Sequence, residues 1–187
     1  MKRPTLAEHC YSSRNVFSGN LLQVYQDEVV LPDGRNGVRE YIIHPGAVVV
    51  IPWLPERRLV LERQYRHPLK REFLELPAGK LTPGEDPLAA AQRELLEETG
   101  YSATRWHLLC RIHPCIGYAN EEMFLYMAEE LTLTRPNWDE DELIEVVELP
   151  LDAAMEGIRT GLITDAKTVV GLFWAEKWVR QEWVLEG

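Results

Sequence analysis

The sequence has few cysteines, no long apolar run and a shortage of positive charge. Its three cysteines, Cys10, Cys110 and Cys115, are odd in number and lack CxxC spacing, which argues against a disulfide framework or a zinc site. No segment reaches the roughly 18 consecutive apolar residues of a transmembrane helix. Residues 1–10 lack the apolar core of a secretory signal. We therefore expect a cytoplasmic protein with reduced thiols.

Basic residues are outnumbered by acidic ones, 20 against 30, which gives a net charge of −10 and a pI near 5.0. Such a surface repels the phosphates of nucleic acids and anionic lipids, so we expect neither nucleic acid nor a membrane as a partner. A small phosphorylated substrate stays compatible with this charge if metal ions supply the positive charge. A chain of 187 residues is long enough for one domain with a substantial core.

Short apolar segments separated by turns predict a protein rich in strands. Residues 21–31 and 37–44 flank the turn Pro32-Asp33-Gly34 and predict an antiparallel β-hairpin, which is marginal alone and has to pack on something. The near-continuous apolar run 46–53 predicts a central strand covered on both faces. Further strands are predicted at 58–66, 106–112, 123–127 and 143–149, and helices at 87–99, 151–159 and 166–182. This order predicts an α/β fold with a mixed sheet between helical layers.

One stretch, residues 79–101, combines a turn, a capped helix and a crowd of carboxylates. Pro83-Gly84 is typical of a tight turn. Asp86 is a good N-cap, and Gly100 suits the left-handed residue that ends a helix. The carboxylates of the last two turns are those of Glu94, Glu97 and Glu98.

These carboxylates lie where they weaken a helix. Glu94 and Glu98 form a like-charge pair at i, i+4, which costs roughly 0.2–0.5 kcal/mol. They also lie toward the negative end of the helix dipole, where a cation would be preferred. A divalent cation bound between them would explain the arrangement, and hard oxygen ligands suit Mg²⁺ or Mn²⁺. The alternative is an acidic helix face that is simply solvated.

A longer pattern separates these two readings. Gly79, Glu85 and the run Arg93–Tyr101 follow the spacing G-x5-E-x7-R-E-U-x-E-E-x-G-U, where U is apolar. This stretch resembles the signature of the Nudix hydrolases, with Tyr101 in place of the usual last aliphatic residue. The resemblance implies a Nudix-type α/β/α sandwich and the metal-dependent hydrolysis of a nucleoside diphosphate linked to another group, with Mg²⁺ as the cofactor and Mn²⁺ as an alternative.

The resemblance also implies roles for individual residues of the signature. Glu94 and Glu98 correspond to metal ligands, together with the backbone carbonyl of Ala78. Glu97 corresponds to a catalytic residue, and Arg93 to a residue that orients the carboxylates by a bidentate pair. An ordinary ion pair with Glu97 at i, i+4 is the alternative for Arg93.

Neighbouring segments resemble the ADP-ribose and ADP-sugar pyrophosphatase branch of the family. They are the strand end 63–68, the E-x-P-A-G entry at 75–79 and the loop 115–121. In that loop Gly117 and Glu121 match the branch, whereas Cys115 and Ile116 stand where serine and proline are usual. This departure leaves the identity of the substrate open.

Five residues outside the signature receive roles from this likeness. Glu121 corresponds to a substrate-binding residue. Arg66 corresponds to an arginine that contacts the substrate phosphates, and Arg39 to a weaker candidate for a similar role from a second subunit. The acidic loop 139–142 supplies Glu140 as the general base and Glu142 as an additional metal ligand. The alternative for this loop is a solvated acidic surface, and only geometry can decide, since a base has to lie within hydrogen-bond reach of the attacking water.

The resemblance thus implies an enzyme that hydrolyses ADP-ribose or a related ADP-sugar to AMP and a sugar phosphate. We expect an N-terminal hairpin region at residues 1–44 and a Nudix domain at 45–187, and the resemblance implies a homodimer held together by the hairpin region. The alternatives are another nucleotide substrate, such as GDP-mannose, NADH or a dinucleoside polyphosphate, and a ligand sensor without catalysis.

Overall fold

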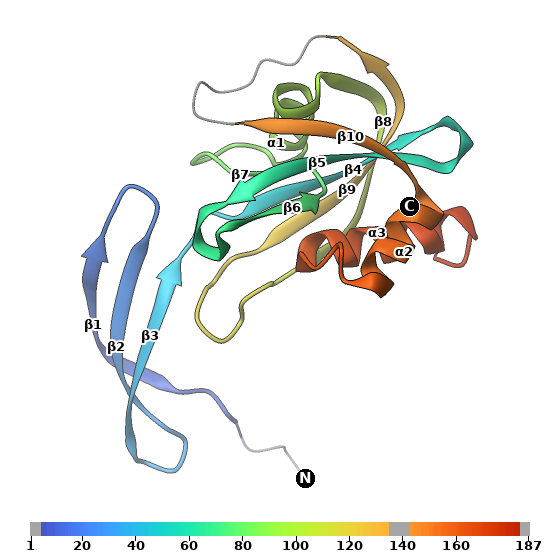
Figure 1. The fold of residues 1–187 in the computed structure, drawn as a ribbon. Helices are drawn as coiled ribbons and strands as arrows, with labels where there is room; N and C mark the ends of the chain where they lie inside the picture. Colours follow the sequence, from blue (N-terminus) through green and yellow to red (C-terminus); the bar gives the residue numbers. More distant parts are fainter. Residues whose placement is uncertain (1–4, 135–142, 184–187) are drawn as a thin grey trace. The chain divides into compact units, whose positions relative to one another are not determined.

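The computed structural model describes residues 5–134 and 143–183 of the chain. It divides into two compact units (Figure 1). The first contains the N-terminal region to residue 45 together with residues 115–121, and the second contains the remainder. None of the helices in the described ranges is long and apolar enough to cross a membrane.

The first unit is a three-stranded antiparallel sheet in the order β1-β2-β3. The predicted hairpin is confirmed as β2 (Gln23–Val30) and β3 (Asn36–Ile43). The sequence did not predict β1 (His9–Ser18), because every one of its residues is exposed and no apolar alternation marks it. Tyr25 and Tyr41 lie opposite each other on β2 and β3, with stacked rings 6.0 Å apart.

The loop 115–121 pairs with the edge of β3 within the first unit. The Ile42 N–H donates to the Tyr118 carbonyl at 2.8 Å, and the Asn120 N–H donates to the Ile42 carbonyl at 3.3 Å. The Asn120 side chain also accepts from the His44 N–H at 2.7 Å. The free edge of a sheet offers unpaired backbone groups, and this loop satisfies those of Ile42 near the end of β3.

The second unit is built on a seven-stranded sheet whose main path runs β10-β5-β4-β9-β8, with β6 paired to β5 and β7 to β4. β4 and β9 are parallel and the other pairs are antiparallel, so the sheet is mixed as predicted. The strands are β4 (Ala47–Leu54), β5 (Arg58–Arg66), β6 (Arg71–Glu75), β7 (Ala78–Lys80), β8 (Tyr101–Ile112), β9 (Met123–Leu133) and β10 (Ile144–Pro150). The helices are α1 (Pro87–Glu94), continued by a π-helical turn (Leu95–Thr99), then α2 (Leu151–Thr160) and α3 (Ala166–Val179).

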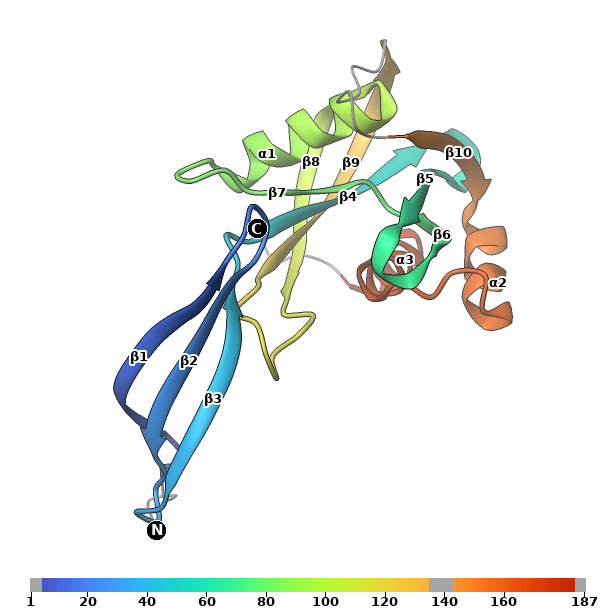
Figure 2. The same ribbon diagram turned by 60° about the vertical axis from the view of Figure 1, so that its left-hand side comes forward.

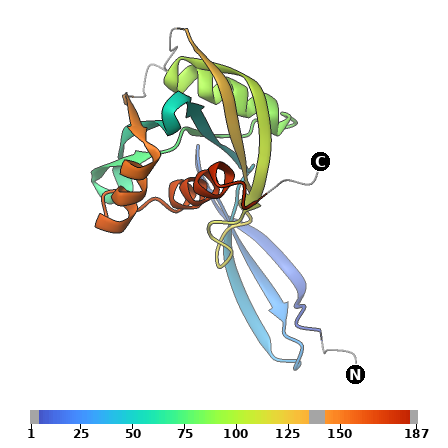
Figure 3. The same cartoon turned by 90° about the vertical axis from the view of Figure 1, so that its right-hand side faces the viewer.

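Helices cover both faces of this sheet (Figure 2, Figure 3). Alternate residues of β4 point to opposite faces. Val48 and Val50 pack with α1, and Val49 and Ile51 pack with α2 and α3. All four side chains are fully buried, which confirms a central strand covered on both sides and the α/β/α sandwich.

Two strands are longer than their sequence pattern indicated. β8 begins at Tyr101 and β9 ends at Leu133, and these two residues pair with each other. After Ala128 the residues of β9 become mostly polar and exposed, so the apolar pattern stops while backbone pairing continues. Burial governs the pattern in the sequence, whereas hydrogen bonding governs the length of the strand.

Candidate functional site

The signature helix begins and ends as its sequence predicts. The Asp86 carboxylate accepts hydrogen bonds from the backbone N–H groups of Leu88 and Ala89 at 3.0 and 3.1 Å. Gly100 ends the helix with a φ of 74°, the left-handed conformation that favours glycine. The last turn is π-helical, which a 3.6-residue periodicity does not anticipate, and such widened turns are frequent at functional sites.

Three candidate metal ligands converge on the start of β7. The Ala78 N–H donates to Glu98 Oε2 at 3.0 Å. The Glu94 carboxyl group lies directly over Gly79, because a Cβ built on Gly79 would stand 1.8 Å from Glu94 Cδ. A Cβ at position 79 would occupy the space of this carboxylate, which explains on steric grounds why the first residue of the signature is a glycine. The structure therefore brings together Ala78, Glu94 and Glu98.

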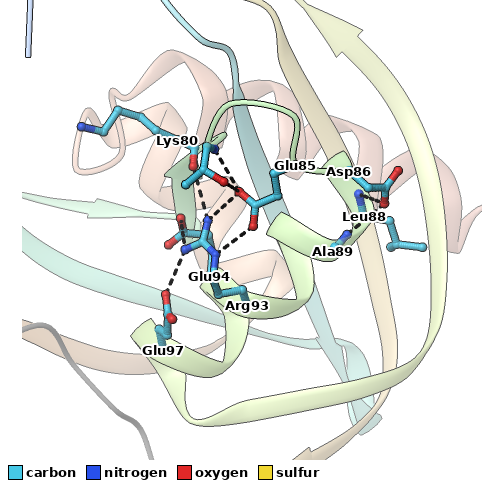
Figure 4. Close-up of polar contacts among 9 residues, drawn as sticks. Lys80, Glu85, Asp86, Leu88, Ala89, Arg93, Glu94 and Glu97 are labelled. Carbon is cyan, nitrogen blue, oxygen red and sulfur yellow. Dashed lines mark hydrogen bonds and ion pairs between the residues drawn. The ribbon is translucent and has the colours of Figure 1, made fainter.

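Arg93 lies at the centre of a carboxylate cluster beside these residues (Figure 4). It forms a bidentate pair with Glu85, with Nε–Oε1 and Nη2–Oε2 distances of 3.0 and 3.1 Å. Its Nη1 donates to Glu94 at 2.8 Å and to Glu97 at 3.0 Å. Arg93 thus forms both of the interactions considered from the sequence, a bidentate pair and an ion pair with Glu97 at i, i+4. Its functional role stays a prediction.

The contacts within this cluster shift the pKa values of Glu85 and Arg93. The Arg93 guanidinium, aided by the Thr82 N–H and hydroxyl, lowers the pKa of Glu85 to about 2. In return Glu85, followed by Glu94 and Glu97, raises the pKa of Arg93. Arg93 therefore stays charged at every working pH and offsets part of the repulsion among the signature carboxylates.

Glu62 is a buried carboxylate on β5 that the sequence analysis did not single out. Its side chain is fully buried, and neither oxygen meets a hydrogen-bond donor among the described residues. Burial, reinforced by Glu75, raises its pKa to about 7 against the opposing effects of Lys167 and Arg66, and Glu98 lies beside it. A signal existed in the sequence: Glu62 follows Val60 at the strand period, and Val60 is in the core beneath α1.

We expect Glu62→Gln to stabilise the metal-free protein at pH 8. The pKa of Glu62 rises from 4.5 to about 7 on folding, so ionisation of Glu62 destabilises the fold. This destabilisation grows as the pH rises from 4.5 to about 7 and is constant at higher pH. Removing the charge should add about 2 kcal/mol and raise Tm by roughly 5 °C at pH 8, with little gain at pH 4.5. Thermal melts of both proteins in EDTA at the two pH values measure this. A lower Tm for the variant at pH 8 would show that Arg66 and Lys167 stabilise the charged form.

Arg66 lies at the end of β5 and pairs with the buried Glu75 of β6. Its Nε and Nη2 donate to the two Glu75 oxygens at 2.7 and 2.8 Å. Burial alone would raise the pKa of Glu75, but Arg66 and Lys167 outweigh it and hold that pKa below its usual range. The Arg66 side chain is nevertheless 40% exposed, so part of it faces solvent.

Arg39 and Glu121 belong to the first unit, where the structure gives both a local partner. Arg39 pairs with Glu8 in a bidentate manner, with an Nε–Oε2 distance of 2.9 Å. Glu121 lies 3.6 Å from His44 Nδ1. A depression of about 260 Å³ in this unit is lined by residues 39–41 and 116–120. The predicted base Glu140 and the predicted ligand Glu142 lie outside the described residues.

The donors at the start of β7 fit a divalent cation by their chemistry. A backbone carbonyl and two carboxylates are hard oxygen donors of the kind that Mg²⁺ and Mn²⁺ prefer. The open space over Gly79 holds a carboxylate group where a side chain would exclude it. Within residues 5–134 and 143–183, no three acidic, histidine or cysteine side chains are already clustered as a complete metal site. The described carboxylates are instead engaged with Arg93 and with the Ala78 N–H.

Comparison with known proteins links this site to a family. The model of the NUDIX domain matches residues 43–169, and that of the nucleoside diphosphate sugar hydrolase N-terminal domain matches residues 8–42. A methanol dehydrogenase activator of Bacillus methanolicus is 40% identical over 88% of this chain and 90% of its own. An ADP-ribose pyrophosphatase of Bacillus subtilis is 37% identical over 90% and 92% of the two chains. The crystal structure of an ADP compounds hydrolase superposes with a TM-score of 0.84 at 25% identity, covering 94% of this chain and 95% of the other.

Proposed function

Because this chain belongs to the NUDIX domain family, we propose that it hydrolyses the diphosphate of ADP-ribose or a related ADP-sugar to AMP and a sugar phosphate. It is a nucleoside diphosphate sugar pyrophosphatase. One observation carries the proposal: Glu94 and Glu98 meet at the Ala78–Gly79 backbone, beside a carboxylate cluster held by Arg93. The relatives with ADP-ribose or ADP compounds in their names extend over nearly the whole chain.

In the reaction, the oxygen of water attacks one phosphorus of the diphosphate and the bridging P–O bond breaks. Ala78, Glu94 and Glu98 would hold the metal ion, with Glu142 proposed from the sequence as a further ligand. Bound there, a divalent cation neutralises phosphoryl charge and lowers the pKa of water. We propose Mg²⁺ as this cation, with Mn²⁺ as an alternative.

The chain's own residues have complementary tasks. Glu140 is proposed to take the proton of the attacking water, on the basis of its sequence position. Arg93 holds the signature carboxylates in a fixed arrangement and limits their mutual repulsion. Arg66, whose side chain is partly exposed, is proposed to bind the substrate phosphates, and Glu97 to act beside the metal ligands.

A substrate panel tests the proposed specificity. We expect kcat/KM for ADP-ribose to exceed that for GDP-mannose, NADH and diadenosine polyphosphate by at least roughly tenfold, since a site built for one nucleotide leaves polar groups unpaired with another. Chromatographic identification of AMP and ribose phosphate as the products completes the test. A clear preference for a panel member other than an ADP-sugar would reject this substrate, and binding without any hydrolysis at saturating Mg²⁺ would instead favour a ligand sensor.

The first unit is proposed to be a dimerisation region, with the boundary between the regions at residues 44 and 45. β1 is exposed along its whole length and carries Tyr11, Val16 and Phe17, each about half exposed. Exposed apolar side chains on one sheet favour burial against a partner, and a second copy of this chain is the occupant we propose. Arg39 would then serve the substrate of the partner subunit. Light scattering should give twice the mass of one chain in a cytoplasm-like buffer, and the mass of one chain would exclude the dimer.

A further inference from the structure

A line of charged contacts joins the start of α3 to Arg66. Lys167 contacts a Glu75 oxygen and lies 2.9 Å from an oxygen of Asp165. Glu75 in turn accepts both hydrogen bonds of the Arg66 fork. Lys167 and Glu75 are 8% and 2% exposed, so this pair is shielded from water and from screening by salt.

Two further contacts fix the position of this line. The Asp165 carboxylate caps α3 by accepting from the N–H and the hydroxyl of Thr168, at 3.0 and 2.7 Å. The Thr168 hydroxyl also accepts from the Leu76 N–H at 2.8 Å, in the buried link that follows β6. The start of α3 is thereby bonded to the strand end that carries Glu75. Lys167 thus has a defined position relative to Glu75.

The contacts of this line determine the position of Arg66. Glu75 accepts both hydrogen bonds of the Arg66 fork, Lys167 holds the Glu75 carboxylate, and Asp165 holds Lys167. The two basic and two acidic groups balance in charge, so Lys167 acts on Arg66 by fixing its position. Both recorded hydrogen bonds of Arg66 within the described part of the chain go to Glu75, through Nε and Nη2, which leaves the Nη1 edge for a further acceptor.

We propose that Lys167 is a positioning residue that, through Glu75, holds Arg66 in place for the diphosphate of the substrate. The proposal rests on the function proposed above, in which Arg66 binds the substrate phosphates. Lys167 itself is buried and touches no substrate in this assignment. Its effect should therefore appear in substrate binding and not in the chemical step.

Lys167→Met is expected to raise KM for ADP-ribose roughly tenfold and to change kcat less than about threefold, since uniform binding is lost. Lys177→Met is the matched control, because it makes the same change on the same helix in an ion pair with Glu182 at the surface. It should leave both constants unchanged. A loss confined to kcat, or an unchanged KM for Lys167→Met, would overturn the proposal.

A double-mutant cycle separates action through Glu75 from a general effect on the fold. Glu75→Gln should also raise KM roughly tenfold, and adding Lys167→Met to it should raise KM no further, because the carboxylate through which Lys167 acts is gone. The double variant removes both members of the buried Lys167–Glu75 pair, so it does not leave Glu75 facing the site of a lost lysine, and it remains informative if Lys167→Met alone does not fold. A KM for the double variant near the product of the two single effects contradicts the proposed route.

Binding measured without turnover distinguishes this inference from the proposed function. Calorimetry with ADP-ribose in EDTA should show the same roughly tenfold loss of affinity for Lys167→Met. If the wild-type protein binds ADP-ribose but does not hydrolyse it, the proposed function fails while the cycle can still be completed on Kd values. If the wild-type protein hydrolyses ADP-ribose and the cycle shows independent effects, only the role of Lys167 fails.

Discussion

Replacing Glu98 with glutamine is expected to lower kcat by roughly 10²–10⁴-fold at saturating Mg²⁺, in line with the loss of a metal-site carboxylate. Glu98 is 5% exposed and accepts from the Ala78 N–H, so glutamine fits the same space and keeps one acceptor. It removes the charge that would face the proposed cation. The fold should survive, because the substitution leaves no cavity.

Steady-state kinetics with ADP-ribose and a titration of Mg²⁺ measure this effect. Glu156→Gln is the control, because Glu156 pairs only with the neighbouring Arg159 on the surface of α2 and should tolerate the change. Circular dichroism and Tm check that both variants fold. A Glu98→Gln protein with near-normal kcat would remove Glu98 from the metal site and with it the central assignment of the signature.

Arg93→Lys should lower kcat/KM by about 10²-fold, although it keeps the charge. Arg93 holds three carboxylates at once, two oxygens of Glu85 and one each of Glu94 and Glu97. Lysine has one ammonium and cannot reproduce the planar fork that fits Glu85. Glu94 and Glu97 would then move apart, and Glu94 would leave its place over Gly79.

The kinetic constants of Arg93→Lys should be compared with those of Arg63→Lys, which changes an arginine paired with Glu145 at the surface of the same unit. We expect the latter to keep wild-type activity within about twofold, since exposed pairs contribute little. An Arg93→Lys enzyme of wild-type efficiency would mean that charge alone, and not the fork, organises the cluster.

The signature and its helix could be predicted from the sequence because their constraints are local. Asp86 and Gly100 lie at the two ends of one short helix, and the structure has both caps as expected. Glu94 lies over Gly79 and Glu98 accepts from the Ala78 N–H, while their role as metal ligands stays a prediction. The pattern did not predict the π-helical turn at Leu95–Thr99. A π-helical turn changes the backbone hydrogen bonding from i, i+4 to i, i+5, and no residue type in the sequence indicates this change.

Contacts between residues far apart in the sequence could not be predicted in the same way. Glu75 pairs with Lys167 across 92 positions, and no local rule connects those two residues. Glu62 lies two residues after the core residue Val60 on β5, so the strand period indicates its burial, but its proximity to Glu75 depends on the pairing of β5 with β6. β1 escaped prediction for the opposite reason, because a fully exposed strand has no apolar period to detect.

The pairing of residues 115–121 with β3 affects how chimeras between related proteins can be built. A chimera that exchanges only the N-terminal region between two relatives would separate the Ile42 backbone from Tyr118 and Asn120, its hydrogen-bond partners. The transplanted sheet would then expose an unmatched edge strand. The first unit is thus formed by two separate segments of the chain, residues 1–45 and 115–121. A chimera that keeps this unit intact has to exchange both segments together.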